Sequence, residues 1–433
     1  MGKLGVKGKQ FNFNIVDAIV IFFNIAAARG NFLPYWFFNS TKTIWVEAII
    51  ILIDLLYLFF RLGINFRGYF DKNNAPIYFA VILLAYNTFN VFLHGGNYVP
   101  YFEYLFVIFL FSIILNSICG IMKVIPQPLT TKVKQISKGY VWISLLSVFG
   151  VFLSFILLRI GLNSYIPIDA DFLNANIEKG ATYFLSFFSI NSYDSVLRVP
   201  FFQDFGILTG LFHEPHVFSY NAFPCIFLLF AFYQKNRLVQ AFLILMALLV
   251  VLFSGSTTNI LSLSLTLLVL FVIKIRSHFF EVSFSLLVIV AVIYFYIGSD
   301  STLYEFVLGR LAVDNYSQQY SVSLLEFAFT PRSVFGSDFL ATDYVDGLSS
   351  GQDVGVIPFL LNICFLLTYL RNVVFLLKRG EDRLCLCVAL SSLYFIFHST
   401  KMGMTMYLQT TYVLLVFLQS LILNNYGRVK TAK

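Results

Sequence analysis

Long apolar runs alternate with short polar segments along most of the chain. An apolar run of about 20 residues crosses a bilayer as a helix, because lipid offers no partner for free backbone groups. We therefore predict an all-α, polytopic integral membrane protein with about 12 transmembrane helices. They are expected near residues 13–28, 44–60, 77–94, 102–122, 140–158, 217–233, 238–253, 258–273, 280–298, 355–370, 384–398 and 405–423.

Two of the connecting segments, 159–216 and 299–354, are much longer than the others. Together they hold most of the 22 acidic residues of the chain. Both contain amphipathic stretches, such as "ATYFLSFFSI" at 181–190, which are typical of segments lying in the membrane interface. We expect residues 1–433 to form a single membrane domain whose two large loops lie on the same side and do its chemical work.

Composition indicates a membrane protein, and the distribution of charge predicts its orientation in the membrane. Hydrophobic residues make up 59% of the chain and charged residues 12%, whereas soluble domains have roughly 45–50% and about 25%. Most of the 29 lysines and arginines fall on the side of the membrane that holds both termini, which predicts cytoplasmic termini and two periplasmic loops. The net charge of +7 is then largely an orientation signal, and we expect no nucleic-acid partner.

Three acidic residues, Asp17, Glu47 and Asp54, fall within or at the edge of the first two predicted spans. Glu47 and Asp54 are seven positions apart and so share one helix face. Ionisable groups inside a membrane are costly and often functional. They are candidates either for a proton or ion path or for hydrogen bonds between neighbouring helices.

The stretch "GLFHEPHVFSY", residues 210–220, ends the first long loop and opens the sixth predicted span. Pro215 suits a first helical turn, which puts His213 and Glu214 at the helix start. Free backbone N–H groups there favour anions. Gly210 lets the backbone approach a ligand closely. Arg198 lies twelve positions upstream of Gly210.

Three stretches resemble one family. "RVPFFQDFGILTGLFHEPHVFSYNAFP" is similar to the signature of the Wzy-type O-antigen and capsular polysaccharide polymerases, in which an outer-loop arginine precedes a G-x-F-x-E-P motif opening a helix. "FSGSTTNILSLSLTLLVLF" resembles the family's Ser/Thr-rich turn and following helix. "FTPRSVFGSDFL", followed by "GQDVGVIPFLLNICFLLTYL", resembles its second outer loop and the next helix. The resemblance covers about residues 195–371.

The resemblance implies a bundle like those of the GT-C glycosyltransferases, in the bacterial cytoplasmic (inner) membrane, with its active site facing the periplasm. It implies an enzyme of lipopolysaccharide or capsule synthesis that joins two undecaprenyl-pyrophosphate-linked oligosaccharides. A hydroxyl of one unit attacks the anomeric carbon of the other, and the lipid pyrophosphate leaves. No cofactor and no metal are implied, and a chain-length regulator is an expected protein partner.

The same resemblance assigns roles to individual residues. Arginines stabilise the leaving pyrophosphate, because their planar fork pairs with phosphate oxygens. Arg198 is the first candidate; in the second loop Arg310 and Arg332 both remain open, because Arg310 lacks the following glycine of the family pattern. Glu214 is the preferred base, with His213 and His216 as alternates. Further groups at the same membrane face are Arg159, His398 and Lys401.

Two other functions stay open. An O-antigen ligase would transfer finished glycan from the same carrier, but ligases usually have one large late loop, whereas two comparable loops occur here. A flippase or transporter is the second alternative, although we see no two related halves and the outer loops are long.

Overall fold

The computed structural model describes most of the predicted bundle and part of its first loop. The described residues are 13–27, 43–63, 69–93, 99–160, 165–168, 181–184, 189–192, 207–208, 210–212, 215–254, 257–274, 356–399 and 409–431. Each predicted apolar run within them coincides with a helix. The run at 280–298 and the whole loop at 299–354 lie outside the described residues.

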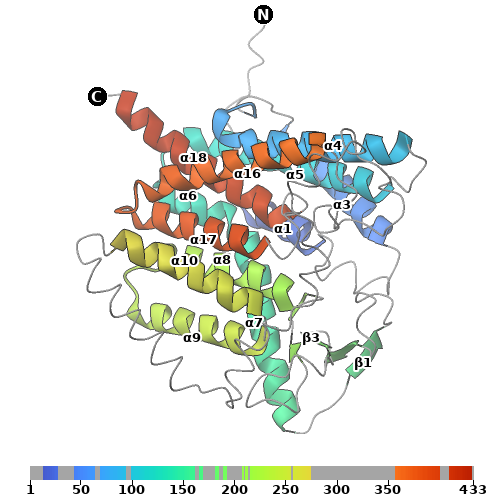
Figure 1. Cartoon of the computed structure of the whole chain (residues 1–433), viewed down its shortest axis with the longest axis vertical. Coiled ribbons are helices and arrows are strands. Elements are labelled where there is room, and N and C mark those ends of the chain that lie inside the picture. Colours follow the sequence, from blue (N-terminus) through green and yellow to red (C-terminus); the bar gives the residue numbers. More distant parts are fainter. Residues whose placement is uncertain are drawn as a thin grey trace, which may run out of the picture.

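The first half of the bundle begins with α1 and ends with α7. Its elements are α1 (Ile15–Ala26), α3 (Thr43–Tyr57) with the π-helical turn η1 (Leu58–Leu62), the short 3-10 helix η2 (Lys72–Asn74), α4 (Ala75–Leu93), α5 (Val99–Val124), α6 (Leu129–Ile136) and α7 (Lys138–Arg159). In Figure 1, α7 runs toward the side of the molecule where the strands lie.

The second half begins at α8. Its helices are α8 (Pro215–Phe232), α9 (Arg237–Ser254), α10 (Thr257–Lys274), α16 (Val356–Leu377), α17 (Arg383–Ser399) and α18 (Thr410–Thr431). Helices α8 and α17 pack against each other, and α16 packs against α4 from the first half (Figure 1). Segments far apart in sequence therefore share one core.

Helix length and composition indicate a membrane protein. Among the described residues, three helical segments are long and apolar enough to cross a bilayer: Phe102–Val124, Lys138–Leu157 and Leu360–Leu377. Shorter apolar helices accompany them at Ile15–Ala26, Val217–Phe232, Arg237–Val251, Leu261–Ile273 and Arg383–His398.

The first long loop contains a small β-sheet, which corrects the all-α expectation for this region. Strands β1 (Tyr165–Ile168), β2 (Ala181–Phe184), β3 (Ser189–Ser192) and β4 (Ile207–Leu208) form an antiparallel meander in sequence order. Residues 181–190, expected to form an amphipathic interfacial piece, instead contribute β2 and the start of β3. Ile168 pairs with Ala181, and Ala181 pairs in turn with Ser192.

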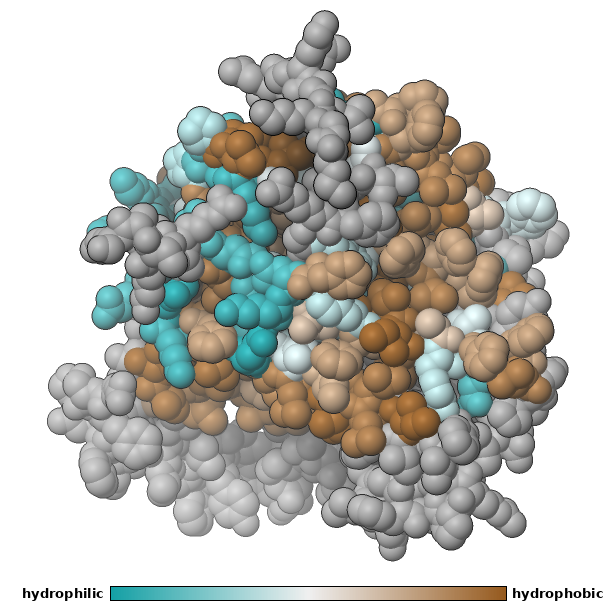
Figure 2. Space-filling model, turned by 90° about the horizontal axis from the view of Figure 1, so that it is seen from above, coloured by the Kyte–Doolittle hydropathy of each residue, from teal (hydrophilic) through white to brown (hydrophobic). Residues whose placement is uncertain are grey.

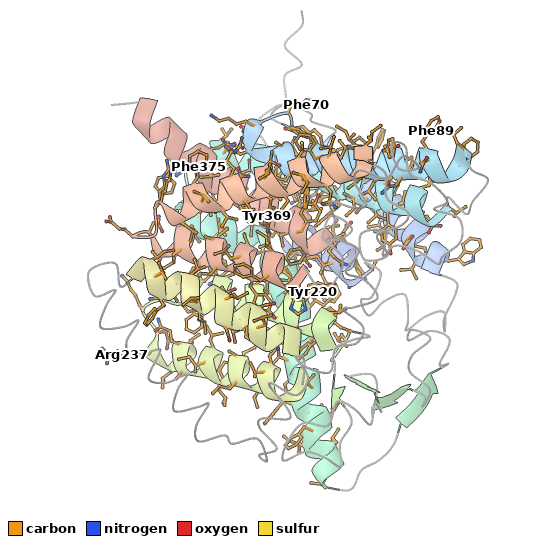
Figure 3. The ribbon with its side chains drawn as sticks, viewed as in Figure 1. Phe70, Phe89, Tyr220, Arg237, Tyr369 and Phe375 are labelled. Carbon is orange, nitrogen blue, oxygen red and sulfur yellow. The ribbon has the colours of Figure 1, made fainter. Side chains whose placement is uncertain are left out.

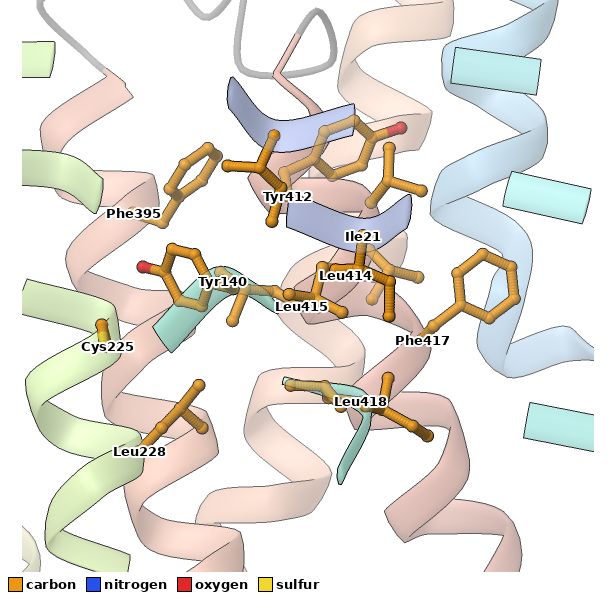
Figure 4. Packing of buried hydrophobic residues seen from close by; sticks show 14 of the residues in the cluster. Ile21, Tyr140, Cys225, Leu228, Phe395, Tyr412, Leu414, Leu415, Phe417 and Leu418 are labelled. Atoms are coloured by element: carbon orange, nitrogen blue, oxygen red, sulfur yellow. The ribbon is translucent and has the colours of Figure 1, made fainter. Parts of the chain in front are cut away.

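The core is apolar and the outside is apolar too. Figure 4 shows Ile21, Tyr140, Phe417 and their neighbours packed between helices from both halves of the chain. On the surface, Phe59 and Phe60 remain 77% and 79% exposed, and Leu238 remains 84% exposed. Figure 2 shows hydrophilic residues gathered toward one side of a face that is otherwise largely hydrophobic. Such extensive exposed apolar surface is expected where the surroundings are lipid.

The predicted intramembrane acids are buried. Asp17 and Asp54 have no exposed surface, and Glu47 is 5% exposed. Asp17 closes the first turn of α1 by a reciprocal capping box with Asn14. The same carboxylate accepts hydrogen bonds from the Arg61 Nε and Nη2 atoms, each at 2.9 Å. For Asp17, the structure thus shows hydrogen bonding between neighbouring helices.

Candidate functional site

Helix α8 starts where the sequence predicts. It begins at Pro215, directly after Glu214, because proline fits a first turn in which its missing N–H is not needed. His216 is the second residue of this helix. Glu214 and His213 lie outside the described residues, so the proposed base and its first alternate are located only by the helix that follows them.

Gly210 brings the chain against α7 just before α8 begins. Its φ of +62° lies in the left-handed region that favours glycine. A Cβ atom at this position would lie 2.9 Å from the carbonyl oxygen of Ser147. We expected the missing side chain to admit a ligand, but the close approach is to the backbone of α7. Gly210 therefore fixes where the motif segment leaves the sheet and enters the helical bundle.

A polar cluster centred on Asn221 anchors the first half of α8. The Asn221 carbonyl oxygen accepts hydrogen bonds from the hydroxyls of Tyr140 and Ser144 on α7, the latter at 3.2 Å. Its side-chain oxygen accepts a bond of 2.8 Å from Thr411 on α18. Its amide nitrogen donates to the Val217 carbonyl at 2.9 Å. Asn221 thus ties α8 to α7 and α18, five residues after His216.

An aromatic cluster lies beside it, where α17 ends. The His398 ring stacks on Tyr394, with centroids 5.6 Å apart, and lies 5.8 Å from the ring of Tyr220 on α8. The Tyr394 hydroxyl donates a 2.6 Å hydrogen bond to the side-chain oxygen of Asn259 on α10. We call the end of the bundle where these two clusters meet the motif end. Figure 3 shows Tyr220 at this end and Arg237 at the opposite one.

His398 is the one sequence-predicted binding residue whose side-chain position is described. We expected it at the outer face beside Lys401, but its side chain has no exposed surface. It packs between two tyrosines near the start of α8. In this arrangement His398 supports the aromatic cluster rather than presenting itself to a ligand at the surface.

The predicted basic residues are either distant from Gly210 or not described. Arg159 is the last residue of α7, twelve positions beyond Ser147, which corresponds to about 18 Å along a helix. The backbone at Arg159 is therefore well separated along α7 from the point that Gly210 touches. Arg198, Arg310, Arg332 and Lys401 lie outside the described residues.

Sequence reasoning missed the polar groups that hold the site in place. Asn221, Asn259 and Thr411 are each fully or almost fully buried within apolar helices. Their polarity inside predicted spans was the available signal, because a buried amide or hydroxyl in a membrane helix needs a partner. The partners come from other helices, and the local pattern does not name them.

The described part of the motif end supplies hydroxyls, amides and aromatic rings. These groups are buried and can hold a helix in place, but stabilising an anion and accepting a proton need charged groups. The charged candidates nearest in sequence, Arg198 and Glu214, flank the β4–Gly210 segment that leads into α8. The clusters thus form a rigid support for the start of α8.

Comparison with known proteins identifies no relative. No family model, no curated protein and no solved structure matches the chain.

Proposed function

We propose that the protein is a polysaccharide polymerase that joins undecaprenyl-pyrophosphate-linked oligosaccharide repeat units at the outer face of the bacterial cytoplasmic membrane. The observation that supports this most is the motif "GLFHEP", whose last residue opens α8, a helix that buried hydrogen bonds tie to α7, α18 and α17. A glycosyl transfer needs such a fixed geometry for a base and a cation.

The topology proposed is twelve spans with both termini in the cytoplasm. Contacts between basic and aromatic side chains at the ends of helices support it: Lys134 lies over Tyr233, Lys138 over Trp142 and Arg379 over Tyr426. All three cations belong to segments assigned to the cytoplasm. Basic residues mark cytoplasmic loops, and aromatic residues favour the membrane interface. The sheet, Gly210 and the start of α8 then belong to the periplasmic side.

In the proposed reaction, a sugar hydroxyl of one lipid-linked unit attacks the anomeric carbon of the other. Glu214 accepts the hydroxyl proton as the new C–O bond forms. The bond from the anomeric carbon to the pyrophosphate oxygen breaks, and its electron pair leaves with the undecaprenyl pyrophosphate. Arg198, together with Arg310 or Arg332 from the second loop, stabilises the charge on that leaving group. No metal or cofactor takes part in this scheme.

Deleting the gene and separating the surface glycan on a gel tests this function. The proposal expects acceptors bearing single repeat units and no longer ladder. Complete loss of glycan would point instead to an O-antigen ligase or to a flippase, and an unchanged ladder would refute a role in assembly.

Complementation with variants then tests the assigned residues. Arg198→Ala and Glu214→Gln are expected to leave single units, whereas Lys235→Ala, in an exposed turn between α8 and α9, is expected to restore the full ladder. Membrane levels of each variant are measured in parallel. A normal ladder with Glu214→Gln would remove Glu214 as the base.

A further inference from the structure

Two buried carboxyl groups on neighbouring helices differ sharply in their surroundings. Asp17 accepts hydrogen bonds from Arg61 and from the Tyr57 hydroxyl, the latter at 2.6 Å, so its charge is compensated. Asp54, on the same face of α3 as Tyr57, has no exposed surface. No described cation forms an ion pair with it. A negative charge on Asp54 would therefore have no described cation beside it.

The single described partner of Asp54 is Asn24 on α1. The Asn24 Nδ2 atom donates to Asp54 Oδ1 at 2.8 Å and to the Val20 carbonyl oxygen at 3.1 Å. These two bonds use both hydrogens of the amide and fix its orientation. Among the described residues, the other oxygen of each group, Asp54 Oδ2 and Asn24 Oδ1, is buried with no hydrogen-bond donor.

A single proton would give both of these buried oxygens a hydrogen-bonding role. An ionised carboxylate only accepts hydrogen bonds, whereas a protonated one also donates from one oxygen. A proton on Asp54 Oδ2 supplies a donor for Asn24 Oδ1, and the acid and the amide then bond reciprocally. An isolated carboxylate in an apolar interior takes up a proton rather than remain charged. A metal cation fits poorly, because it needs several oxygen ligands and no group of three or more candidate ligand residues occurs in the described part of the chain.

We infer that Asp54 is a proton-binding site, at which a neutral carboxylic acid and the Asn24 amide form a reciprocal hydrogen-bonded pair joining α3 to α1. The elements packed against α3 are α1, η1 and α5. The titratable or charged groups with described side chains on α3 itself and on these elements are Glu47 and Tyr57 on α3, Asp17 on α1, Arg61 on η1, and Glu103, Tyr104, Cys119 and Lys123 on α5.

The proton site is connected to the motif end through hydrogen bonds of the backbone and side chains. The Asn24 carbonyl oxygen accepts a 3.2 Å hydrogen bond from Thr410, the first residue of α18. The next residue, Thr411, donates to Asn221 on α8. Loss of the proton would leave a charged Asp54 carboxylate beside Asn24. It would weaken the attachment of α1 to α3 next to the contact between Asn24 and α18.

Infrared difference spectroscopy of the purified full chain in lipid tests the assignment. A protonated carboxylic acid has a carbonyl stretching band that a carboxylate lacks. We expect such a band at neutral pH, its loss in Asp54→Asn, and its retention in Asp17→Asn, because the Asp17 carboxyl group already has hydrogen-bond donors in Arg61 and Tyr57. The band is also expected to shift when aspartate is labelled with carbon-13 at the carboxyl carbon. Absence of any label-sensitive acid band in the wild type, or its survival in Asp54→Asn, would overturn the inference.

Thermal unfolding gives a second readout that does not depend on the band. Asn at position 54 can accept and donate as the protonated acid does, so Asp54→Asn is expected to unfold close to the wild-type temperature. Asp54→Leu leaves the Asn24 amide without its partner and is expected to unfold at a lower temperature. Raising the pH is expected to destabilise the wild type relative to Asp54→Asn; the opposite trend would show that the wild-type site holds a charge.

Discussion

Removing Arg61 is expected to destabilise the bundle more than neutralising its partner Asp17. The Asp17 side chain is fully buried, whereas the Arg61 side chain is 31% exposed. Hydrogen bonding to Asp17 also raises the pKa of the Arg61 guanidinium. Arg61→Met leaves a buried carboxylate without its cation. Asp17→Asn leaves a cation that can still reach polar surroundings.

The structure sets the size of each effect. Stripping one partner from a buried ion pair costs about 3–5 kcal/mol. Asp17 keeps the Tyr57 hydroxyl and the Asn14 N–H as donors, so we expect about 3 kcal/mol for Arg61→Met. In Asp17→Asn the amide oxygen still accepts from Tyr57, and we expect about 1 kcal/mol. In the double variant no charge is buried, so its cost is expected to be about 1–2 kcal/mol, which gives a coupling of about 2–3 kcal/mol.

Unfolding in mixed lipid–detergent micelles, followed by the intrinsic fluorescence of the tryptophans, measures the four variants of this cycle. Arg237→Met, at the exposed start of α9, is the matched control and is expected to change stability by less than about 0.5 kcal/mol. The charge argument is refuted if Asp17→Asn costs as much as Arg61→Met, or if the two single effects simply add.

Three further substitutions test how the helices pack. Gly139→Ala should destabilise the protein by about 2 kcal/mol, because the new Cβ would lie 2.3 Å from the Ala18 carbonyl oxygen of α1. Alanine favours helix more than glycine does, so a gain in thermal stability would contradict this contact. Gly210→Ala should lower the free energy of unfolding by at least about 1–2 kcal/mol, because alanine disfavours the left-handed backbone at this position. Protease susceptibility of the preceding loop is a second readout, and an unchanged cleavage pattern would argue against the packing of Gly210 on α7. Thr411→Val removes the bond to Asn221 and should cost about 1 kcal/mol, so wild-type thermal stability would show that this bond does not anchor α8.

The helices were predictable because their signal is local. Apolar runs located the long described helices, though not every end, and they did not predict the short polar helices α6 and η2. The run expected at 355–370 continues as α16 to Leu377. The helix passes Arg371 because its guanidinium donates to the Lys72 carbonyl oxygen and Asn372 donates to that of Asn73. These partners lie on η2, and hydropathy alone cannot anticipate them.

The sheet and the site depended on contacts between distant residues. Nothing within residues 181–190 indicates that β2 pairs with β1, because the partner strand lies more than ten positions away and period-2 alternation is weak in both. Pro215 did predict the start of α8. The support beneath it could not be predicted, since Thr411 and Asn221 are 190 residues apart and Tyr394 and Asn259 are 135 apart. Sequence located the motif, and tertiary packing decided what surrounds it.

The most direct test of the central claim is an in vitro reaction with the purified protein in lipid vesicles and undecaprenyl-pyrophosphate-linked repeat units as the sole substrate. The account predicts products of two and more repeats, with release of undecaprenyl pyrophosphate, in the presence of a metal chelator and without any nucleotide. Glu214→Gln and Arg198→Ala should abolish elongation. Failure of the wild-type protein to lengthen the glycan would contradict a polymerase. Movement of intact units across the vesicle membrane, or transfer in a parallel reaction to which a lipid A core acceptor is added, would show the alternative function.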